Sequence, residues 1–326
     1  MSKILIPLSL WCVFTPFYLQ AKNNEPFNQG SVDDAFHKGC LLYAQYKFTE
    51  AEEWLTYAAD QGNQDAAYLN ARLLAFQTQP KNFPEQSKKK LENVANQGHL
   101  ESMRFLYEKG EWLTRQERLQ WQQHYYNQLI NLGAEKPAQA YFRLSQYHNS
   151  IEHKALSDYE LQQAVKLELP NAYLAYAGQL PIEEAKAIYL TEAKKGVIPA
   201  IRHVITILEQ EGKFDQALYW REINAELGDL PSVASLGLIY QGNSERYNFV
   251  PQDLAKAYAY YLNYLENAGT ARFSRLYKKI DENLNTLSSV LSPELLTDAN
   301  TLAQSWNSTQ YYYYDALWEQ ANCSTK

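Results

Sequence analysis

Apolar residues recur along most of the chain at the three- and four-residue spacing of an amphipathic α-helix. In the segment that begins at Phe48, for example, Ala51, Trp54, Leu55 and Ala58 fall on one helical face. Polar turns interrupt this pattern at short intervals, so the sequence predicts helices arranged in consecutive pairs. The first helices are expected at 32–46, 66–76, 100–109, 138–147, 172–179, 200–211 and 236–242. Their partners are expected at 48–62, 84–96, 114–132, 157–167, 181–195, 214–227 and 251–269.

A recurring signal marks the end of each pair. In its full form it is Ala-x-x-Gly, followed four residues later by a small residue. The full signal or a degenerate form of it stands at Gly62, Gly98, Gly133, Glu168, Gly196, Gly228 and Gly269. Successive marks lie 28 to 41 residues apart. A period of this size is typical of a solenoid of stacked helical repeats.

The seventh pair contains the most informative stretch, Leu236-Gly237-x-x-Tyr240. Leu236 and Tyr240 are four residues apart and therefore share a helix face. Gly237 has no side chain, so a second helix can cross there at close range. Ala257 gives that second helix a small contact surface. These residues predict a tightly crossed helical hairpin.

The turn of the same hairpin carries matching signals. Gly242 suits the end of the first helix, because glycine adopts the left-handed conformation readily. Pro251 suits the first position of the next helix, and Asp253 its first turn. Together with the preceding residues, this unit resembles a repeat of the Sel1-like family, a relative of the tetratricopeptide repeat. The resemblance implies an all-α fold: a right-handed α-solenoid of stacked helix-turn-helix repeats with a C-terminal capping helix.

The pattern changes at both ends of the chain. Residues 1–21 are predicted to be a signal peptide, residues 22–31 a flexible lead-in, and residues 32–269 about seven helix pairs. Residues 270–326 are expected to form capping helices and an aromatic tail that holds Tyr311–Tyr314 and Trp318. Within this part, Ser292-Pro293-Glu294 is a strong helix start, with a capping hydroxyl followed by proline and an acid.

Export is the expected fate of the chain. Ile4–Leu19 is mostly apolar, and Leu19-Gln20-Ala21 is an acceptable cleavage site. Trp11 precedes Cys12, whereas a lipoprotein signal requires a small residue there, so we favour a cleaved protein without a lipid anchor. An uncleaved N-terminal anchor is the alternative. The resemblance to exported Sel1-like proteins implies the periplasm as the destination.

The charge balance argues against one class of partner. The formal charge is -7, and removal of residues 1–21 makes it -8 because Lys3 is the one charged residue there. An acidic chain argues against non-specific binding to nucleic acid. After residue 21, no stretch is apolar for long enough to cross a bilayer.

The two cysteines that follow the signal sequence are Cys40 and Cys323. They could pair in an oxidising compartment. A stretched solenoid would hold its ends far apart, whereas a disulfide requires Cα atoms within about 7 Å. We therefore expect two free thiols, with Cys40 in the small-residue packing position that Gly237 fills in the seventh pair.

The sequence offers little catalytic chemistry. His148 and His153 are the closest histidine pair, but further zinc ligands at suitable spacing are missing. No nucleophile elbow and no phosphate-binding loop is present. We expect no catalytic residues, metal, cofactor or small-molecule substrate. The resemblance implies a scaffold or adaptor that binds another protein; the alternative is an immunity protein that neutralises a secreted antibacterial effector, such as a type VI lipase.

The binding face is expected on the first helix of each pair, which lines the concave groove in tetratricopeptide-like stacks. The residues placed there are Tyr68, Arg72, Arg104, Arg143, Arg202 and Thr206. Arginine binds carboxylates through its planar set of donors. The hypothesis is that an acidic segment of a partner docks along these arginines, with Tyr68 as a stacking surface. The alternative is that the arginines pair with Glu and Asp on neighbouring helices.

Overall fold

The computed structural model describes residues 31–75, 78–270, 274–306 and residue 323. These residues form sixteen α-helices and two short 3₁₀ helices, η1 (Pro80–Asn82) and η2 (Glu245–Tyr247), and include no strand. The α-helices are α1 (Val32–Ala44), α2 (Phe48–Asp60), α3 (Gln64–Leu74), α4 (Glu85–Asn96), α5 (Leu100–Lys109), α6 (Arg115–Glu135), α7 (Pro137–Ser150), α8 (Lys154–Lys166), α9 (Pro170–Ala177), α10 (Ile182–Lys194), α11 (Ile198–Gln210), α12 (Phe214–Glu226), α13 (Leu230–Tyr240), α14 (Leu254–Asn267), α15 (Ser274–Val290) and α16 (Pro293–Ser305).

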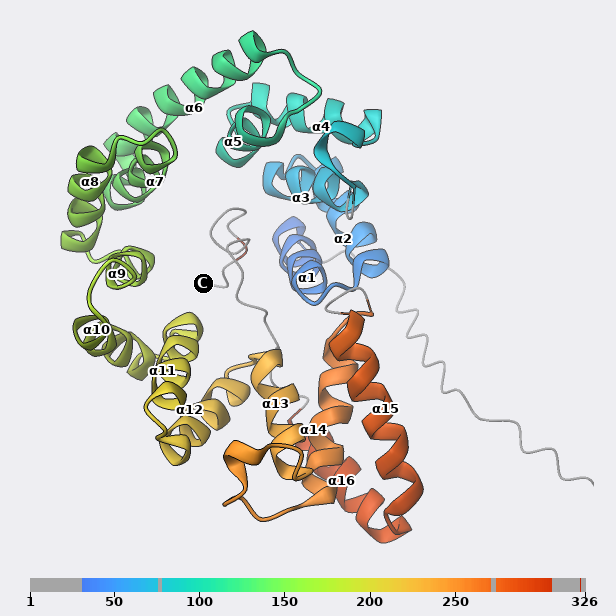
Figure 1. Cartoon of the computed structure of the whole chain (residues 1–326). Helices are drawn as coiled ribbons and strands as arrows, with labels where there is room; N and C mark the ends of the chain where they lie inside the picture. Colours follow the sequence, from blue (N-terminus) through green and yellow to red (C-terminus); the bar gives the residue numbers. More distant parts are fainter. Residues whose placement is uncertain (1–30, 76–77, 271–273, 307–322, 324–326) are drawn as a thin grey trace, which may run out of the picture.

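From α1 to α15 the helices stack in the order of the sequence, each against the next. Figure 1 shows the odd-numbered helices α1 to α13 turned toward the middle of a strongly curved array, with their even-numbered partners outside them. Helices α15 and α16 follow the seventh pair and pack on α14. The predicted all-α solenoid of stacked helix pairs with a C-terminal capping helix is confirmed.

The repeat marks act through backbone conformation. Gly62, Gly98, Gly196 and Gly228 all have positive φ angles, between 82° and 97°, directly after the second helix of a pair. This left-handed conformation lets the chain reverse into the next helix, and glycine adopts it without a steric penalty. Glu168 takes the same position with a φ of 58°, so the degenerate mark still ends its helix.

Two of the predicted marks are wrong as helix ends. Gly133 lies inside α6, which the sequence predicted to stop at Leu132 but which continues to Glu135. Pro137 sets the true end: the residue before a proline is driven out of the α region, and Lys136 has φ -132° and ψ 68°. At the other mark, α14 ends at Asn267, and the amide of Gly269 instead donates a hydrogen bond to the carbonyl oxygen of Gln45 at 2.6 Å.

The close helix crossing predicted at Gly237 is present. A Cβ atom at this position would collide with the ring of Tyr261 in α14. In the first pair the equivalent residue is Gly39, where a Cβ would lie 2.8 Å from Cγ of Leu55. The assignment of Cys40 to this position is therefore wrong by one residue.

The start of α14 also differs from the prediction. The helix begins at Leu254, and Asp253 is its N-cap, accepting a hydrogen bond from the amide of Lys256 at 2.9 Å. Pro251 precedes the helix instead of occupying its first position. By contrast, Ser292 caps α16 as predicted, with its hydroxyl 3.3 Å from the amide of Leu295.

The two cysteines form a disulfide, so the prediction of free thiols is wrong. The Cα atoms of Cys40 and Cys323 lie 5.9 Å apart, although 283 positions separate them in the sequence. The prediction assumed a stretched solenoid. The array instead curves until its ends meet, which also explains the contact of Gly269 with Gln45.

The remaining sequence predictions at the two ends lie outside the described residues. They concern the signal peptide, the lead-in apart from Ser31, and the aromatic residues Tyr311–Tyr314 and Trp318. Ser31 is the N-cap of α1 and forms a capping box with Asp34. The predicted division of the chain at residues 21, 31 and 269 stays a prediction.

Candidate protein-binding face

The six residues predicted to bind a partner lie on α3, α5, α7 and α11. All four are odd-numbered helices, which Figure 1 shows on the inner side of the array. The structure therefore brings the predicted residues to helices that share one side. Their individual environments differ, and three groups can be distinguished.

The first group is Tyr68 and Arg72 on α3. Tyr68 is 1% exposed, and its hydroxyl accepts a hydrogen bond from Nη1 of Arg72 at 2.9 Å. The Arg72 guanidinium also lies 4.7 Å from the centre of the Phe105 ring. Burial raises the pKa of Tyr68 above its usual value. The prediction that Tyr68 offers a stacking surface to a partner is wrong, because neighbouring side chains already cover the ring.

The second group surrounds Glu101 of α5, a carboxylate that is 2% exposed. It forms ion pairs with Arg104 of the same helix, at 3.1 Å, and with Arg143 of α7. Burial raises the pKa of the adjacent Tyr125 to about 12, and the charge of Glu101 adds to this effect. Two predicted arginines therefore share one buried acid, which ties the third helix pair to the fourth.

The third group joins the sixth pair to the seventh. Nε of Arg202 lies 2.8 Å from Oδ1 of Asp229, the N-cap residue of α13. Asp229 is 1% exposed, and its other oxygen accepts from the amide of Ser232 at 3.0 Å. The side chain of Arg202 remains 31% exposed. Thr206, one turn further along α11, donates its hydroxyl to the carbonyl oxygen of Arg202 at 2.9 Å.

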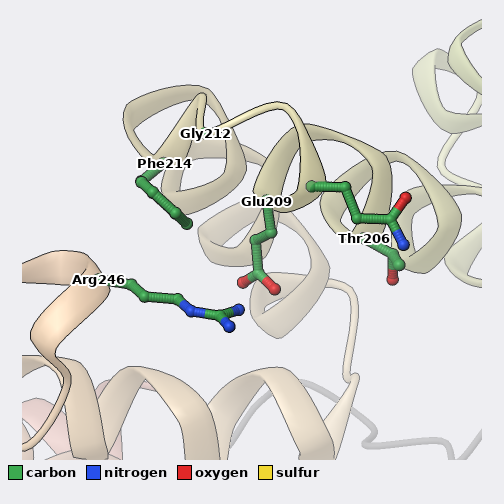
Figure 2. Close-up of a pocket in the computed structure, with 6 residues that line it drawn as sticks. Thr206, Glu209, Gly212, Phe214 and Arg246 are labelled. Carbon is green, nitrogen blue, oxygen red and sulfur yellow. The ribbon is translucent and has the colours of Figure 1, made fainter.

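A pocket of about 520 Å³ lies beside the third group. Its lining residues are Thr206, Glu209, Gln210, Gly212, Phe214 and Arg246. Figure 2 shows the Glu209 and Arg246 side chains extending toward one another from different elements, with the Phe214 ring near the turn at Gly212. One predicted residue, Thr206, is therefore part of a surface hollow.

The two charges in this pocket are held differently. Glu209 accepts a hydrogen bond from the hydroxyl of Tyr247 at 2.6 Å and forms an ion pair with Arg221. Arg246 is exposed and has no ion-pair partner within the described part of the chain. The pocket thus combines a neutralised acid with an available guanidinium and an aromatic ring.

Sequence reasoning missed Arg246 and Phe214. The signal that could have revealed them is the long interval of 41 residues before the mark at Gly269. The additional residues form the loop from Gly242 to Asp253, which contains η2. Tyr247 of this loop reaches back to Glu209 of α11, and this contact positions Arg246 at the pocket.

Two further observations concern site chemistry in the described ranges. No group of three or more His, Cys, Asp or Glu side chains there is arranged to hold a metal ion. His148 pairs with Glu160 at 2.7 Å, and its ring stacks on His153 at 6.1 Å. Among the helices of the same ranges, none is both long and apolar enough to cross a membrane.

Comparison with solved structures gives matches to repeat proteins. One is a protective antigen present in uropathogenic Escherichia coli strains that displays an SLR fold; it is 17% identical, with a TM-score of 0.34, over 91% of this chain and 71% of that one. Another is a Sel1 repeat protein from Oxalobacter formigenes, 15% identical with a TM-score of 0.30, over 81% of this chain and 90% of that one. No family model and no curated protein matches the sequence.

The class of protein follows from the chain's own residues. Left-handed glycines end the second helices, Gly237 and Gly39 permit close crossings, and the pairs stack in sequence order. By fold and repeat pattern this is an all-α solenoid of stacked helix pairs. Such a solenoid exposes an extended surface to its surroundings.

Proposed function

We propose that this chain is an exported, periplasmic Sel1-like repeat protein that acts as a scaffold or adaptor. Its inner surface binds an acidic segment of another protein. The observation that carries the proposal is the group of exposed or partly exposed cations beside α11. Arg202 lies one turn before Thr206 on α11, and Thr206 and Arg246 line the pocket, in a protein with a formal charge of -7.

The geometry of this region supports an acidic ligand. Arg202 is held by Asp229 at one edge of its guanidinium and is 31% exposed. Arg246 has no acidic partner among the described residues, so a ligand carboxylate would gain a pairing that the chain does not satisfy itself. Phe214 adds an apolar surface beside it. An acidic side chain next to an apolar one fits this combination.

The other predicted cations contribute in a different way. Arg104 and Arg143 are engaged with Glu101, and their side chains are 23% and 17% exposed. They add positive potential to the inner side while they remain paired with Glu101. Arg72 is packed against Phe105. The contact with the partner therefore centres on α11 and η2, and the earlier pairs extend the surface.

The disulfide supports export. Bonds such as Cys40–Cys323 persist in oxidising compartments and are rare in the reducing cytosol. This agrees with an N-terminal sequence that has the features of a signal peptide. If the predicted cleavage site is used, the mature protein begins at Lys22. N-terminal sequencing of periplasmic material checks this, and recovery of intact Met1 from the cytoplasm would contradict export.

The decisive experiment is affinity capture of the protein from its own cell envelope, followed by mass spectrometry. A partner with an acidic segment supports the scaffold. Capture of a secreted antibacterial effector would instead support the immunity role. Binding of the identified partner is then measured for Arg246→Glu, which reverses the available charge at the pocket.

Arg115→Glu is the matched control for this variant. Arg115 is also exposed, but it lies at the start of α6, an outer helix in Figure 1. We expect Arg246→Glu to weaken binding at least tenfold and Arg115→Glu to leave it within about twofold, since each tenfold step is about 1.4 kcal/mol. Equal affinities of the two variants, at low as well as physiological salt, would place the partner on another face.

A further inference from the structure

The carboxylate of Glu209 uses its two oxygen atoms unequally. Oε1 accepts a hydrogen bond from the Tyr247 hydroxyl at 2.6 Å and a second one from Nη2 of Arg221. Oε2 accepts no hydrogen bond from the residues that the structure describes, and it is not one of their polar atoms that are buried without a partner. Glu209 lines the pocket, and its side chain extends toward Arg246 (Figure 2). Oε2 is therefore an acceptor that a ligand in the pocket can use.

The two donors on Oε1 hold the carboxylate in one orientation. The side chain of Arg221 is 14% exposed, and its charge balances that of Glu209. Burial raises the pKa of Tyr247 above its usual value, so the hydroxyl stays protonated and remains a donor. An acceptor that is already oriented costs less conformational entropy when a ligand binds. The pocket thus contains a fixed acceptor, and Arg246 carries its remaining positive charge.

A ligand that fits both groups carries one negative charge and one uncharged donor. A peptide segment has both, because every residue other than proline has a main-chain N–H group. We infer that Glu209 accepts a hydrogen bond from the main chain of the partner's acidic segment, while Arg246 binds the carboxylate of that segment. This inference rests on the proposed function and adds to it the conformation in which the segment binds.

The segment binds in an extended conformation. In the interior of an α-helix each N–H group already donates to the carbonyl four residues earlier, so none is available to Glu209. The first turn of a helix does leave N–H groups free. An acidic residue at that end, however, accepts from those N–H groups itself, which removes both from the pocket. An extended acidic segment keeps its N–H group and its carboxylate available at the same time.

The sign of one substitution separates this role of Glu209 from a purely structural one. Glu209→Gln keeps an oxygen for Tyr247 and Arg221 but places an amide donor where Oε2 was. If Glu209 only holds the loop, loss of its negative charge should strengthen the binding of an acidic peptide. If Glu209 accepts the main-chain N–H, the same substitution should weaken that binding.

The probe is a fluorescently labelled peptide, Gly-Ala-Asp-Val-Gly-Ala, whose side chains offer no hydrogen-bond donor once the aspartate is ionised. Fluorescence anisotropy measures its affinity for the full chain. Two further peptides carry a methyl group on the main-chain nitrogen of Asp or of Val. We expect one of these two to bind about tenfold more weakly, because the hydrogen bond to a charged acceptor is lost. A peptide methylated at its last residue is the control and should bind within about twofold of the unmethylated one.

The protein variants complete the test. Glu209→Gln should bind the unmethylated peptide about tenfold more weakly than the parent, and methylation should then have no further effect, because both changes remove the same hydrogen bond. Glu135→Gln is the matched control: it removes the same charge at an exposed position at the end of α6 and should change the affinity by less than about twofold. Urea unfolding checks that both variants fold. If Glu209→Gln does not fold, the methylated peptides decide the question on the parent protein.

The outcomes distinguish this inference from the proposed function. Equal affinities of all the peptides, or binding by Glu209→Gln that is as tight as that of the parent or tighter, would overturn the role of Glu209. The proposed function would still stand in that case if Arg246→Glu weakens the peptide at least tenfold. Absence of binding by the unmethylated peptide, or binding that Arg246→Glu does not change, would contradict the proposed function and this inference together.

Discussion

Two junctions between successive helix pairs use the same residue types with different results. The junction of the third and fourth pairs is built on Glu101, which is 2% exposed and shared by Arg104 and Arg143. The junction of the sixth and seventh pairs joins Arg202 to Asp229, and it is extended by the loop that carries Arg246. The first junction encloses its charges, and the second leaves cations accessible beside a pocket.

The difference shows that repeat position does not decide what an arginine does. Arg104 and Arg202 were both predicted from the count along first helices, and both pair with a buried acid. Arg104 shares Glu101 with a second arginine and is 23% exposed, whereas Arg202 pairs with Asp229 and is 31% exposed. The local neighbour decides. For Arg202 that neighbour is Asp229. The sixth and seventh pairs are in addition joined by the long loop, whose Tyr247 donates to Glu209 of α11, whereas a short turn leads from α5 to the capping box of α6. Four substitutions sharpen this comparison.

The largest effect is expected for Glu101→Ala. It would leave Arg104 and Arg143 without their shared carboxylate in a buried setting. Removal of one partner from a buried ion pair costs about 3–5 kcal/mol. Urea unfolding followed by tryptophan fluorescence measures this loss. A variant that unfolds at the parental midpoint would show that the junction of the third and fourth pairs does not depend on its charges.

A smaller loss is expected for Asp229→Ala. Asp229 caps α13 and pairs with Arg202. Loss of an N-cap costs about 0.5–2 kcal/mol. Arg202, at 31% exposure, can turn toward water and avoid the cost of an unpaired buried charge. The same unfolding measurement applies, and a loss as large as that of Glu101→Ala would mean that the two junctions are equivalent.

Tyr247→Phe tests how the long loop is held. The substitution removes the hydroxyl that donates to Glu209 at 2.6 Å but keeps the ring that lies 5.7 Å from Phe214. A net loss of about 1 kcal/mol is expected from the missing hydrogen bond. Amide hydrogen exchange should accelerate in Glu245–Tyr247 and stay unchanged in α5. Unchanged exchange in both segments would mean that the hydroxyl does not anchor the loop.

Local features of the fold could be predicted from the sequence, whereas long-range ones could not. The helix ends at Gly62, Gly98, Gly196 and Gly228 depend on single φ angles, and the crossing at Gly237 depends on one missing side chain. These are properties of a few adjacent residues. The sequence therefore predicted the repeats and the solenoid, with errors where a proline overrode a glycine, as at Gly133.

The closure of the array and the pocket depend on the relative placement of helices that are far apart in the sequence. Small rotations between neighbouring repeats add up to the curvature of a solenoid, and no single residue reveals that sum. The contact between Gly269 and Gln45 exists because of it. In the same way, the ion pair between Glu101 and Arg143 depends on the register of α5 against α7. The candidate site could be predicted as a set of helices, but not as a set of available side chains.

The smallest effect on stability is expected for Arg246→Ala. Arg246 is exposed and has no ion-pair partner in the described ranges, so its loss should change the free energy of unfolding by no more than about 0.5 kcal/mol. Urea unfolding of the variant beside Glu101→Ala provides the direct contrast. A urea midpoint equal to that of the parent would show that Arg246 does not stabilise the fold and is free to bind a ligand. A loss above about 1 kcal/mol would instead make it structural, as Arg143 is, and the sixth and seventh pairs would then enclose their charges as the third and fourth do.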